Sequence, residues 1–321
     1  MSENLLNTIR NLNILLVGDF FLDEYIHGSV ERMSPEAPVP ILKVLKKTYN
    51  LGGAGNVLNN LINIGCKVTI FGSVGKDHAG SKILSKLNNK KINKKFFQKI
   101  EQIKTIVKSR VVNKNQQIVR IDDEIIQSEI KINQDLKNKL SKEFKKFSLV
   151  IISDYGKGFC SKKICKFIIS TAKKNGIKVV VDPRKNFNDY DKYKYVDFIT
   201  PNLNEMKILF PHIKNETKDI FYYARKIIKN FNIKNVITTR SEKGICYTDG
   251  KKFININTIA KQVFDVSGAG DTVVSVFSVL ISIKKDIKYC LKISNICAGK
   301  VISKIGTTPI SHIEFKKILG L

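Results

Sequence analysis

Histidine and cysteine patterns that bind metals or form disulfides are absent from this 321-residue chain. The four histidines, at positions 27, 78, 212 and 312, lack the spacing of zinc ligands. The six cysteines include no Cys-x-x-Cys pair and mostly lie inside apolar segments, which predicts buried free thiols. The chain also lacks an apolar run of the roughly 18 residues that span a bilayer, and its first residues do not form a signal-peptide pattern. These absences predict a soluble, cytoplasmic protein without a membrane partner.

Acidic side chains are scarce, because 28 Asp and Glu stand against 56 Lys and Arg, a formal net charge of +28. Such an excess is typical of proteins that neutralise nucleic-acid phosphates. Here, however, the lysines are spread among Asn and Ile, as in residues 88–95, without the interleaved aromatics of a base-stacking surface. We therefore predict no nucleic-acid partner and a positive field that attracts anionic small substrates. A basic nucleic-acid-binding protein without enzymatic activity is the least favoured alternative.

Short β-branched runs alternate along the chain with longer amphipathic segments that can form crossover helices. The expected buried strands are residues 14–17, 68–71, 149–152, 178–181, 198–200 and 236–239. This alternation predicts an α/β fold in which helices cover both faces of a mostly parallel sheet, with residues 1–321 forming one domain.

Polar residues follow several of these strands, namely Asp19, Asp154, Asp182, Asn202 and Arg240. Any one of them could simply cap the next helix or turn. In open α/β sheets, however, ligands bind at the carboxyl ends of the strands. The five residues together therefore predict one cleft at that edge.

Two segments, about 20–45 and 105–122, interrupt the α/β alternation. The first contains Pro35, Pro38 and Pro40 among extended residues, and the second reads as two strands around a polar turn. We expect them to form a small β-sheet lid whose exposed edges pair in a homodimer. The Lys- and Asn-rich residues 86–95 are expected to form a solvated helix.

The sharpest local motif is DVSGAGDT at residues 265–272, which leads directly into an apolar helical run. A glycine-rich turn at a helix start aims unpaired backbone N–H groups and the positive end of the helix dipole at one point, which suits a phosphoryl group. Asp271 would oppose that ligand's charge unless it removes a proton from the attacking hydroxyl. The competing interpretation is a carboxylate that only stabilises the helix N-terminus.

Other nucleotide motifs are missing or weaker. The chain has no GxxxxGK[ST] sequence, and its first strand is not followed by the Gly-x-Gly of a dinucleotide site. The second glycine cluster, LGGAGN at residues 51–56, allows close approach of the backbone to a ligand. With Asp19 and Asp23 it suits a pocket in which carboxylates and Asn56 bind sugar hydroxyls.

Residues 52–56 and 265–272 resemble the two signatures of the ribokinase/PfkB family of carbohydrate kinases, and the likeness covers essentially the whole chain. The resemblance implies a ribokinase-like fold and an ATP- and Mg²⁺-dependent phosphotransferase with an alcohol group as acceptor. It implies a catalytic group made of Asp271 as base and the anion hole Gly268, Ala269 and Gly270. It implies nucleotide contacts from Asn202, Leu203, Asn204, Glu205, Ser241, Gly244 and Asn295, with Glu205 organising Mg²⁺ through water. It implies sugar contacts from Asp19, Asp23, Gly52, Gly53 and Asn56.

Within this family, residues 34–40, 153–158, 200–205 and 239–242 are similar to the branch that acts on D-glycero-β-D-manno-heptose 7-phosphate. That likeness implies phosphorylation of the anomeric O1 to give the 1,7-bisphosphate, for ADP-heptose and lipopolysaccharide core synthesis. A phosphate dianion needs paired cations, so we expect Arg110, Arg120 and Lys157 to bind the distal phosphate. The likeness to the bifunctional member of this branch ends near Leu321, and we expect no nucleotidyltransferase domain. A kinase of another sugar is the alternative.

Overall fold

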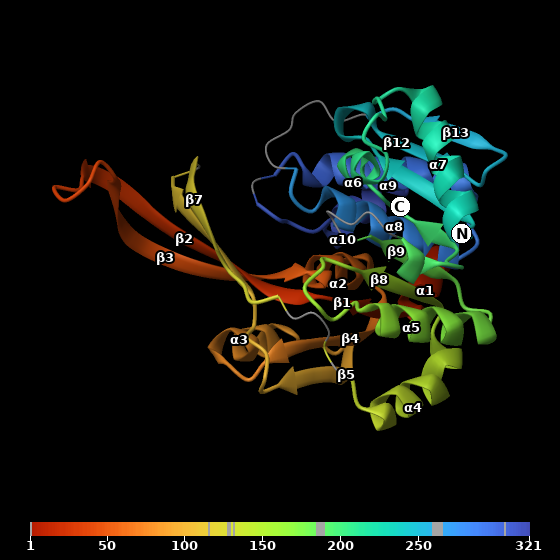
Figure 1. Ribbon diagram of the computed structural model, residues 1–321, viewed down its shortest axis with the longest axis horizontal. Helices are drawn as coiled ribbons and strands as arrows, with labels where there is room; N and C mark the ends of the chain where they lie inside the picture. Colours follow the sequence, from red (N-terminus) through yellow and green to blue (C-terminus); the bar gives the residue numbers. More distant parts are fainter. Residues whose placement is uncertain are drawn as a thin grey trace.

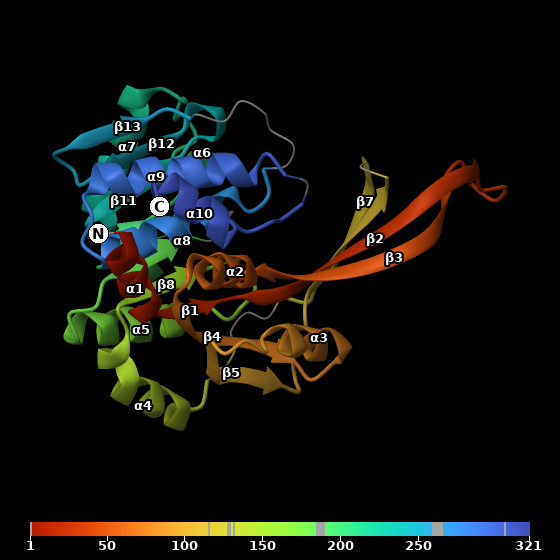
Figure 2. The ribbon, with the colours of Figure 1, turned by 180° about the vertical axis from the view of Figure 1, so that it is seen from behind.

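A computed structural model of the chain describes residues 2–114, 116–126, 130, 132–183, 190–258, 266–304 and 306–321. The chain forms a body of helices around a large sheet, and a second sheet projects from this body as an arm (Figures 1 and 2). The two sheets meet where the chain leaves the first strand, so residues near that point can contact both.

Among the described residues, nine strands form the main sheet. In spatial order they are β13 (Phe253–Ile256), β12 (Ile245–Thr248), β11 (Asn235–Thr239), β10 (Phe198–Ile199), β9 (Val179–Asp182), β8 (Leu149–Ser153), β1 (Asn13–Gly18), β4 (Lys67–Gly75) and β5 (Ile92–Ile100). The strands from β11 to β5 are parallel, whereas β12 and β13 run antiparallel. All six predicted strands are present, and the mostly parallel sheet is confirmed.

Helices cover both faces of this sheet. They are α1 (Ser2–Asn11), α2 (Ala54–Ile64), α3 (His78–Lys86), α4 (Gln134–Glu143), α5 (Lys162–Lys174), α6 (Leu203–Leu209), α7 (Thr217–Phe231), α8 (Ala269–Ser282), α9 (Ile287–Val301) and α10 (His312–Ile318). Alternate residues of β1 belong to two cores: Ile14 and Leu16 pack with α2, α8 and α9, while Leu15 and Val17 pack with α5 and α7. The central strands β1, β4 and β8 are buried on both faces, as is typical of apolar parallel strands.

The second sheet has the order β3-β2-β6-β7, formed by β2 (Phe20–Met33), β3 (Pro40–Gly53), β6 (Val107–Asn113) and β7 (Gln116–Asp123). Strand β2 pairs antiparallel with β3 and parallel with β6. The two segments expected to form a small sheet do so, and β3 continues past them to Gly53. The 51–56 glycine cluster therefore joins this sheet to α2.

The expected helix at residues 86–95 is wrong. Helix α3 ends at Lys86, and β5 begins at Ile92 as a parallel partner of β4. Phe96 is 2% exposed while the neighbouring lysines face solvent, so pairing with β4 and burial of one aromatic ring override the polar composition. The prediction for the cysteines is confirmed, because all six are buried free thiols. Within the described ranges, no helix combines the length and apolar character that crossing a membrane requires.

Candidate active site

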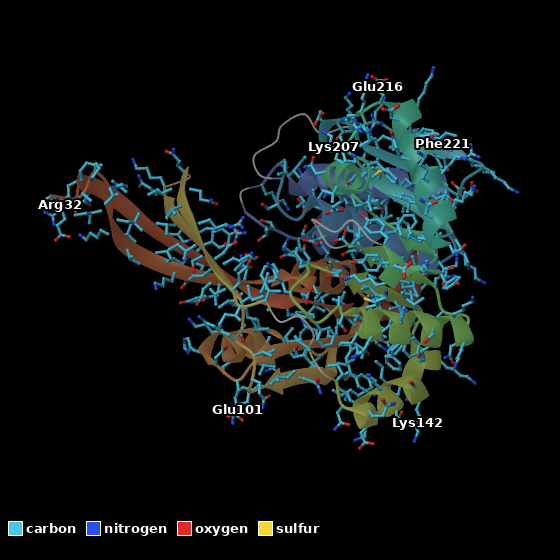
Figure 3. The ribbon with its side chains drawn as sticks, viewed as in Figure 1. Arg32, Glu101, Lys142, Lys207, Glu216 and Phe221 are labelled. Atoms are coloured by element: carbon cyan, nitrogen blue, oxygen red, sulfur yellow. The ribbon has the colours of Figure 1, made fainter. Side chains whose placement is uncertain are left out.

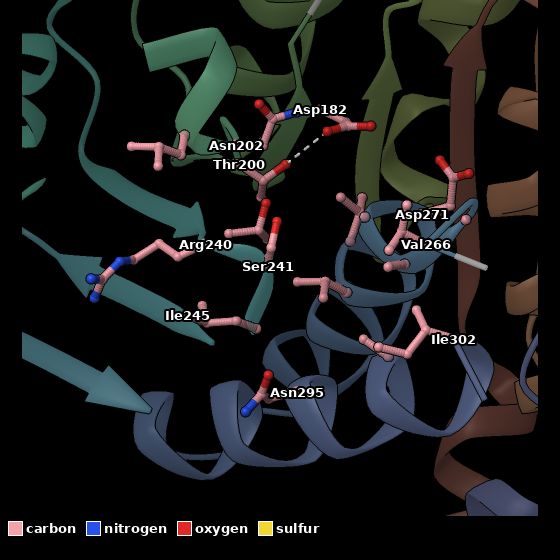
Figure 4. A pocket seen from close by; sticks show the side chains of 18 of the residues that line it. Asp182, Thr200, Asn202, Arg240, Ser241, Ile245, Val266, Asp271, Asn295 and Ile302 are labelled. Carbon is pink, nitrogen blue, oxygen red and sulfur yellow. Dashed lines mark hydrogen bonds between the residues drawn. The ribbon is translucent and has the colours of Figure 1, made fainter. Parts of the chain in front are cut away.

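A cavity of about 630 Å³ lies at the carboxyl edge of the main sheet, where β8 to β11 end, and it is bordered by the start of α8 and the C-terminal half of α9. Four of the five predicted strand-end residues line it: Asp154, Asp182, Asn202 and Arg240. In Figure 4, Asp182 and Asp271 lie toward one end of the cavity and Asn295 toward the other. The cleft predicted from strand ends is therefore present.

Ten of the predicted site residues line this cavity: Asn202, Leu203, Asn204, Ser241, Gly244, Gly268, Ala269, Gly270, Asp271 and Asn295. In the described part of the chain, the predicted residues away from its lining are Asp19, Asp23, Gly52, Gly53, Asn56, Arg110, Arg120, Lys157 and Glu205. Most of this second group lies at the base of the second sheet. Apart from Glu205, the structure thus separates the predicted phosphoryl and nucleotide residues, which line the cavity, from the predicted sugar and distal-phosphate residues.

The glycine-rich turn opens directly into the cavity. Gly268 adopts φ 83° as the N-cap of α8, a left-handed conformation that favours glycine. A Cβ atom placed on Gly268 or Gly270 would meet no atom within 4 Å, so space remains beside this helix start for a ligand. The positive end of a 14-residue helix therefore faces open volume. Asp265, the first residue of the motif, lies outside the described residues.

Asp271 lies in the first turn of α8 and is 4% exposed. Its carboxylate accepts a hydrogen bond of 2.7 Å from the hydroxyl of Tyr155, in the loop after β8. Tyr155 also lines the cavity and was not among the predicted site residues. Tyr155 belongs to the 153–158 segment that resembles the heptose branch, but its contact with Asp271 could not be predicted, because the two residues are 116 positions apart.

Asn202 and Glu205 form a capping box at the start of α6. The backbone N–H of Glu205 donates to Asn202 Oδ1, and the backbone N–H of Asn202 donates to Glu205 Oε2, both at 2.9 Å. The Asn202 side-chain amide also donates to Glu205 Oε1 at 2.7 Å. The buried Glu205 carboxylate therefore orients the segment that lines the cavity.

The turn after β11 is held from behind by Arg240. Its guanidinium donates to Asn215 Oδ1 at 2.9 Å and to the Asn215 carbonyl at 3.1 Å, and it extends away from Asp271 (Figure 4). Gly244 has φ 82°, and a Cβ there would collide with the carbonyl oxygen of Ile256. At the other end of the cavity, Asn295 donates to the Asn257 carbonyl at 2.8 Å. These contacts fix the wall opposite α8.

Asp19 faces a loop instead of the cavity. Its carboxylate is 3% exposed and accepts backbone hydrogen bonds from Tyr155 at 2.9 Å, Lys157 at 3.2 Å and Phe159 at 2.9 Å. Burial, together with the nearby charge of Asp154, raises the pKa of Asp19 to about 6. These contacts give Asp19 a role in loop geometry.

Asp23 and the glycine cluster lie where the second sheet leaves the body. Asp23 is 2% exposed and accepts a hydrogen bond from Arg110 on β6. A Cβ on Gly52 would overlap the Asp23 carboxylate and the Phe21 ring, and Gly53 needs φ 62°. Asn56, in the first turn of α2, is half-buried. The sequence predicted that these glycines let the backbone approach a ligand closely. In the structure, the backbone at Gly52 instead approaches the Asp23 side chain.

Each cation predicted to bind the distal phosphate has a carboxylate partner. Arg110 pairs with Asp23, Arg120 donates two hydrogen bonds to Asp122 at 2.7 and 2.6 Å, and Lys157 lies 2.7 Å from Glu124. The Arg120 hydrogen bonds hold the pKa of Asp122 well below its usual range, and the Lys157 hydrogen bond lowers that of Glu124.

A buried charged cluster lies behind the cavity. Single ligand atoms of Asp19, Asp154 and Cys160 lie within 4.8 Å of one another, as in a metal site. The ammonium of the buried Lys192, however, pairs directly with Asp154, and the Tyr193 hydroxyl donates to the same carboxylate at 2.7 Å. A fixed side-chain cation therefore already balances this carboxylate.

Comparison with known sequences gives a consistent set of relatives. The model of the pfkB family carbohydrate kinases matches residues 16–313. The bifunctional protein HldE of Campylobacter curvus is 40% identical over 312 residues, which cover 97% of this chain and 65% of that protein. The HldE protein of Helicobacter acinonychis is 36% identical, covering 96% of this chain and 66% of its own length. The chain thus spans about two thirds of the length of these relatives.

Solved structures share the fold at low sequence identity. Arabidopsis thaliana ribokinase, complexed with ribose and ATP, has a TM-score of 0.77 at 18% identity, covering 97% of this chain and 99% of its own. Escherichia coli phosphofructokinase-2, in complex with potassium, has a TM-score of 0.75 at 18% identity, covering 96% and 98%. The ribokinase-like architecture predicted from the strand pattern and the signatures is confirmed.

Proposed function

The chain belongs to the pfkB family of carbohydrate kinases, phosphotransferases that act on a sugar hydroxyl, and we propose that its reaction is ATP-dependent phosphorylation of D-glycero-β-D-manno-heptose 7-phosphate at O1. The product would be the 1,7-bisphosphate, an intermediate on the way to ADP-heptose and the lipopolysaccharide core. The 40% identity to a bifunctional HldE protein over 97% of the chain supports this substrate. We place the reaction in the cytoplasm.

The observation that carries the proposal is the position of Asp271 in the first turn of α8, on the wall of the 630 Å³ cavity. In the proposed step, the Asp271 carboxylate accepts the proton of the sugar hydroxyl, and the sugar oxygen forms a bond to the γ-phosphorus of ATP. The bond from that phosphorus to the β–γ bridging oxygen breaks, and ADP leaves with the electron pair. The N-terminus of α8, with Gly268 and Gly270, stabilises the charge that develops on the transferred group.

The cavity provides a site for ATP between α8 and the turn at Ser241–Lys243. The glycine-rich helix start suits the phosphates of ATP, with Asn202, Ser241 and Gly244 also on the cavity lining, whereas Asn295 lies at the end away from Asp271 and suits the base (Figure 4). Positive field from the whole chain favours both anionic substrates.

Hard oxygen donors near the phosphate end suit Mg²⁺. Asp182 lines the cavity, and the Glu205 carboxylate contacts Asn202 of the same wall, so two carboxylates lie at or directly behind it. Glu205 and Asp182 would hold the ion, mostly through water. A bound Mg²⁺ would supply positive charge that neutralises the phosphates.

We further propose that Asp23 and Asn56 bind sugar hydroxyls and that the Arg110 and Arg120 face of the second sheet binds the 7-phosphate. Asp23, Tyr25 and His27 alternate along β2 with Leu22, Glu24 and Ile26, so the two sets lie on opposite faces of the sheet, and the face with Asp23 is polar. Arg110 and Arg120 both belong to the polar face, because Arg110 pairs with Tyr25 and with Arg120 in the strand register. A closing movement of this sheet would make it a lid.

The opposite face of the second sheet favours a homodimer. Val119 and Ile121 of β7 are 46% and 52% exposed, and Leu45 of β3 is 68% exposed. Arg32 marks the far tip of the same sheet, well away from the body (Figure 3). A second copy that presents the same face in a two-fold arrangement would bury these side chains.

The test is a panel of phosphorylated and free sugars, assayed for ADP release from ATP with the wild-type protein. We expect the heptose 7-phosphate to be turned over, with phosphorus NMR placing the new phosphate on carbon 1. Turnover only of another sugar would replace the substrate with that of a different pfkB kinase. Absence of turnover with every sugar would contradict the proposed reaction.

A further inference from the structure

Tyr155 connects the two parts of the site, although the proposed reaction does not use it. Its hydroxyl donates to Asp271 Oδ1 at 2.7 Å, and its ring meets Phe21 of β2 edge-on, with centroids 5.5 Å apart. We propose that Tyr155 is a positioning residue that holds the Asp271 carboxylate in its reactive orientation, and that Asp19 acts on catalysis by holding the loop that carries Tyr155. This inference rests on the proposed role of Asp271 as the base.

The loop is built to present its backbone N–H groups to carboxylates. Gly156 and Gly158 adopt φ 69° and 106°, a left-handed conformation that L side chains rarely take. The alternating N–H groups of residues 155, 157 and 159 converge on Asp19, and the N–H of Gly156 donates to Asp154 at 2.8 Å. Such a concave arrangement of N–H groups binds an anion, here an internal one. The backbone of Tyr155 is therefore fixed from the end of β1.

The carboxylate anchors are themselves held in place. Asp154 pairs with the buried Lys192 and accepts a hydrogen bond from Tyr193, so its second oxygen is oriented toward Gly156. The backbone of Asp19 also receives the N–H of Ala54, the first residue of α2, at 2.9 Å. One network therefore runs from β1 and α2 through the loop to the carboxylate on α8.

The direction of the Tyr155 hydrogen bond is set by charge. Burial and the charge of Asp271 raise the pKa of the Tyr155 phenol well above its usual value, so the phenol keeps its proton and donates. A donated hydrogen bond stabilises the ionised carboxylate and thereby lowers the pH at which the base is protonated. It also restricts rotation of the carboxylate, which a reacting group needs to retain its alignment.

Several other charged groups face this region. Asp182 at the end of β9 and Asp23 on β2 both bear on the Tyr155 phenol, and Asp23 is balanced by Arg110 of β6. On the loop itself, Lys157 is balanced by Glu124. Burial and the charge of Asp154 raise the pKa of Asp19, which holds the loop, to about 6. All of these groups remain in a Tyr155→Phe variant, so a change in its pH profile reports on the lost phenol.

The experiment compares Tyr155→Phe with wild type, using ATP and the sugar of the panel that the wild-type protein phosphorylates fastest. The ring and its contact with Phe21 are kept. We expect kcat to fall roughly 10- to 100-fold, as for reacting groups misplaced by ~1 Å, with the KM of each substrate within about twofold. We also expect the acidic limb of the plot of kcat against pH to move to higher pH by about 1 unit, because the base loses a hydrogen bond that stabilises its ionised form.

Tyr247→Phe is the matched control, because the Tyr247 hydroxyl donates a similar buried hydrogen bond of 2.7 Å to Asn235, away from the cavity. It should lower the melting temperature and leave kcat and the pH profile unchanged. Asp19→Asn should reproduce the kinetic pattern of Tyr155→Phe. Because both substitutions act through one contact, the kcat of the variant that carries both should lie within about twofold of the kcat of the slower single variant.

Wild-type kcat and an unshifted acidic limb in Tyr155→Phe would overturn the inference. So would a loss of kcat without any pH shift, since a structural defect alone produces that pattern. If Asp271→Asn is inactive while Tyr155→Phe is normal, only this inference fails. If Asp271→Asn is active, the proposed base fails with it.

Discussion

Arg110 on β6 and Arg120 on β7 are direct neighbours in the strand register, on the same face of the second sheet, and each pairs with a carboxylate. The Arg110 partner, Asp23, comes from β2, whereas the Arg120 partner, Asp122, lies two residues along the same strand. Two guanidinium groups side by side repel each other unless anions separate them. A distal phosphate would thus enter a site whose charges are already arranged, and it would share or replace these carboxylates.

Removing Arg120 should weaken binding of a phosphorylated sugar more than that of its unphosphorylated form. A hydrogen bond to a charged group contributes about 2 kcal/mol, which corresponds to roughly a 30-fold change in affinity. We therefore expect Arg120→Gln to raise the KM of the sugar phosphate by about that factor at similar kcat. Lys47→Gln is the control, since Lys47 is a second-sheet cation on the opposite face, 3.8 Å from Glu24. Equal effects of the two variants would contradict the assignment.

Asp271→Asn should stop turnover while leaving ATP binding nearly intact. The amide keeps the size of the carboxyl group and can still accept the Tyr155 hydrogen bond, but it cannot take up the proton of the sugar hydroxyl. Because proton transfer contributes roughly 100- to 10,000-fold, we expect kcat to fall at least 100-fold. Steady-state kinetics and calorimetric ATP titration measure the two quantities. Full activity in this variant would rule out Asp271 as the base.

The raised pKa of Asp19 predicts how stability depends on pH. A pKa of about 6 in the folded chain, against 3.8 for an exposed Asp, means that protonation of Asp19 favours the folded state. The ionised form therefore costs stability at neutral pH, and this cost disappears as pH falls from about 6 toward 4. Wild type should gain about 1 kcal/mol relative to Asp19→Asn between pH 7.5 and pH 5. Urea unfolding at both pH values measures the difference; a change of opposite sign would mean that the three amide hydrogen bonds outweigh burial.

The exposed apolar side chains Val119 and Ile121 of the second sheet predict a dimer that a single charge disrupts. Ile121→Asp places a carboxylate among Val119 and its neighbours, where a second copy would have to bury it. Sedimentation at micromolar concentration should show a dimer for wild type and a monomer for Ile121→Asp. Ile313→Asp is the matched control on α10, because Ile313 is 79% exposed on the body and should tolerate the charge. A wild-type monomer at that concentration would contradict the proposal.

Much of the fold was predictable because it depends on patterns within short stretches of chain. The uniformly apolar runs that became β1, β4, β8 and β9 are typical of strands buried on both faces. The glycine-rich start of α8, which places Asp271 at the cavity, was also predictable, because that motif lies within one short stretch of the chain. The region of β5 was mistaken for a helix because one buried ring, Phe96, and pairing with β4 decide its structure, and neither appears in composition.

The sequence by itself determined the layered α/β architecture, the family, and the residues that meet at the carboxyl edge of the sheet, since parallel strands bring their ends to one edge whatever the details of packing. Only the tertiary structure decided which polar groups pair. It turned Asp19 toward the 155–159 loop, gave Arg110 and Arg120 carboxylate partners, and brought Tyr155 to Asp271 across 116 positions. A side chain's partner depends on the burial and direction of both groups, and no local pattern in the sequence records that.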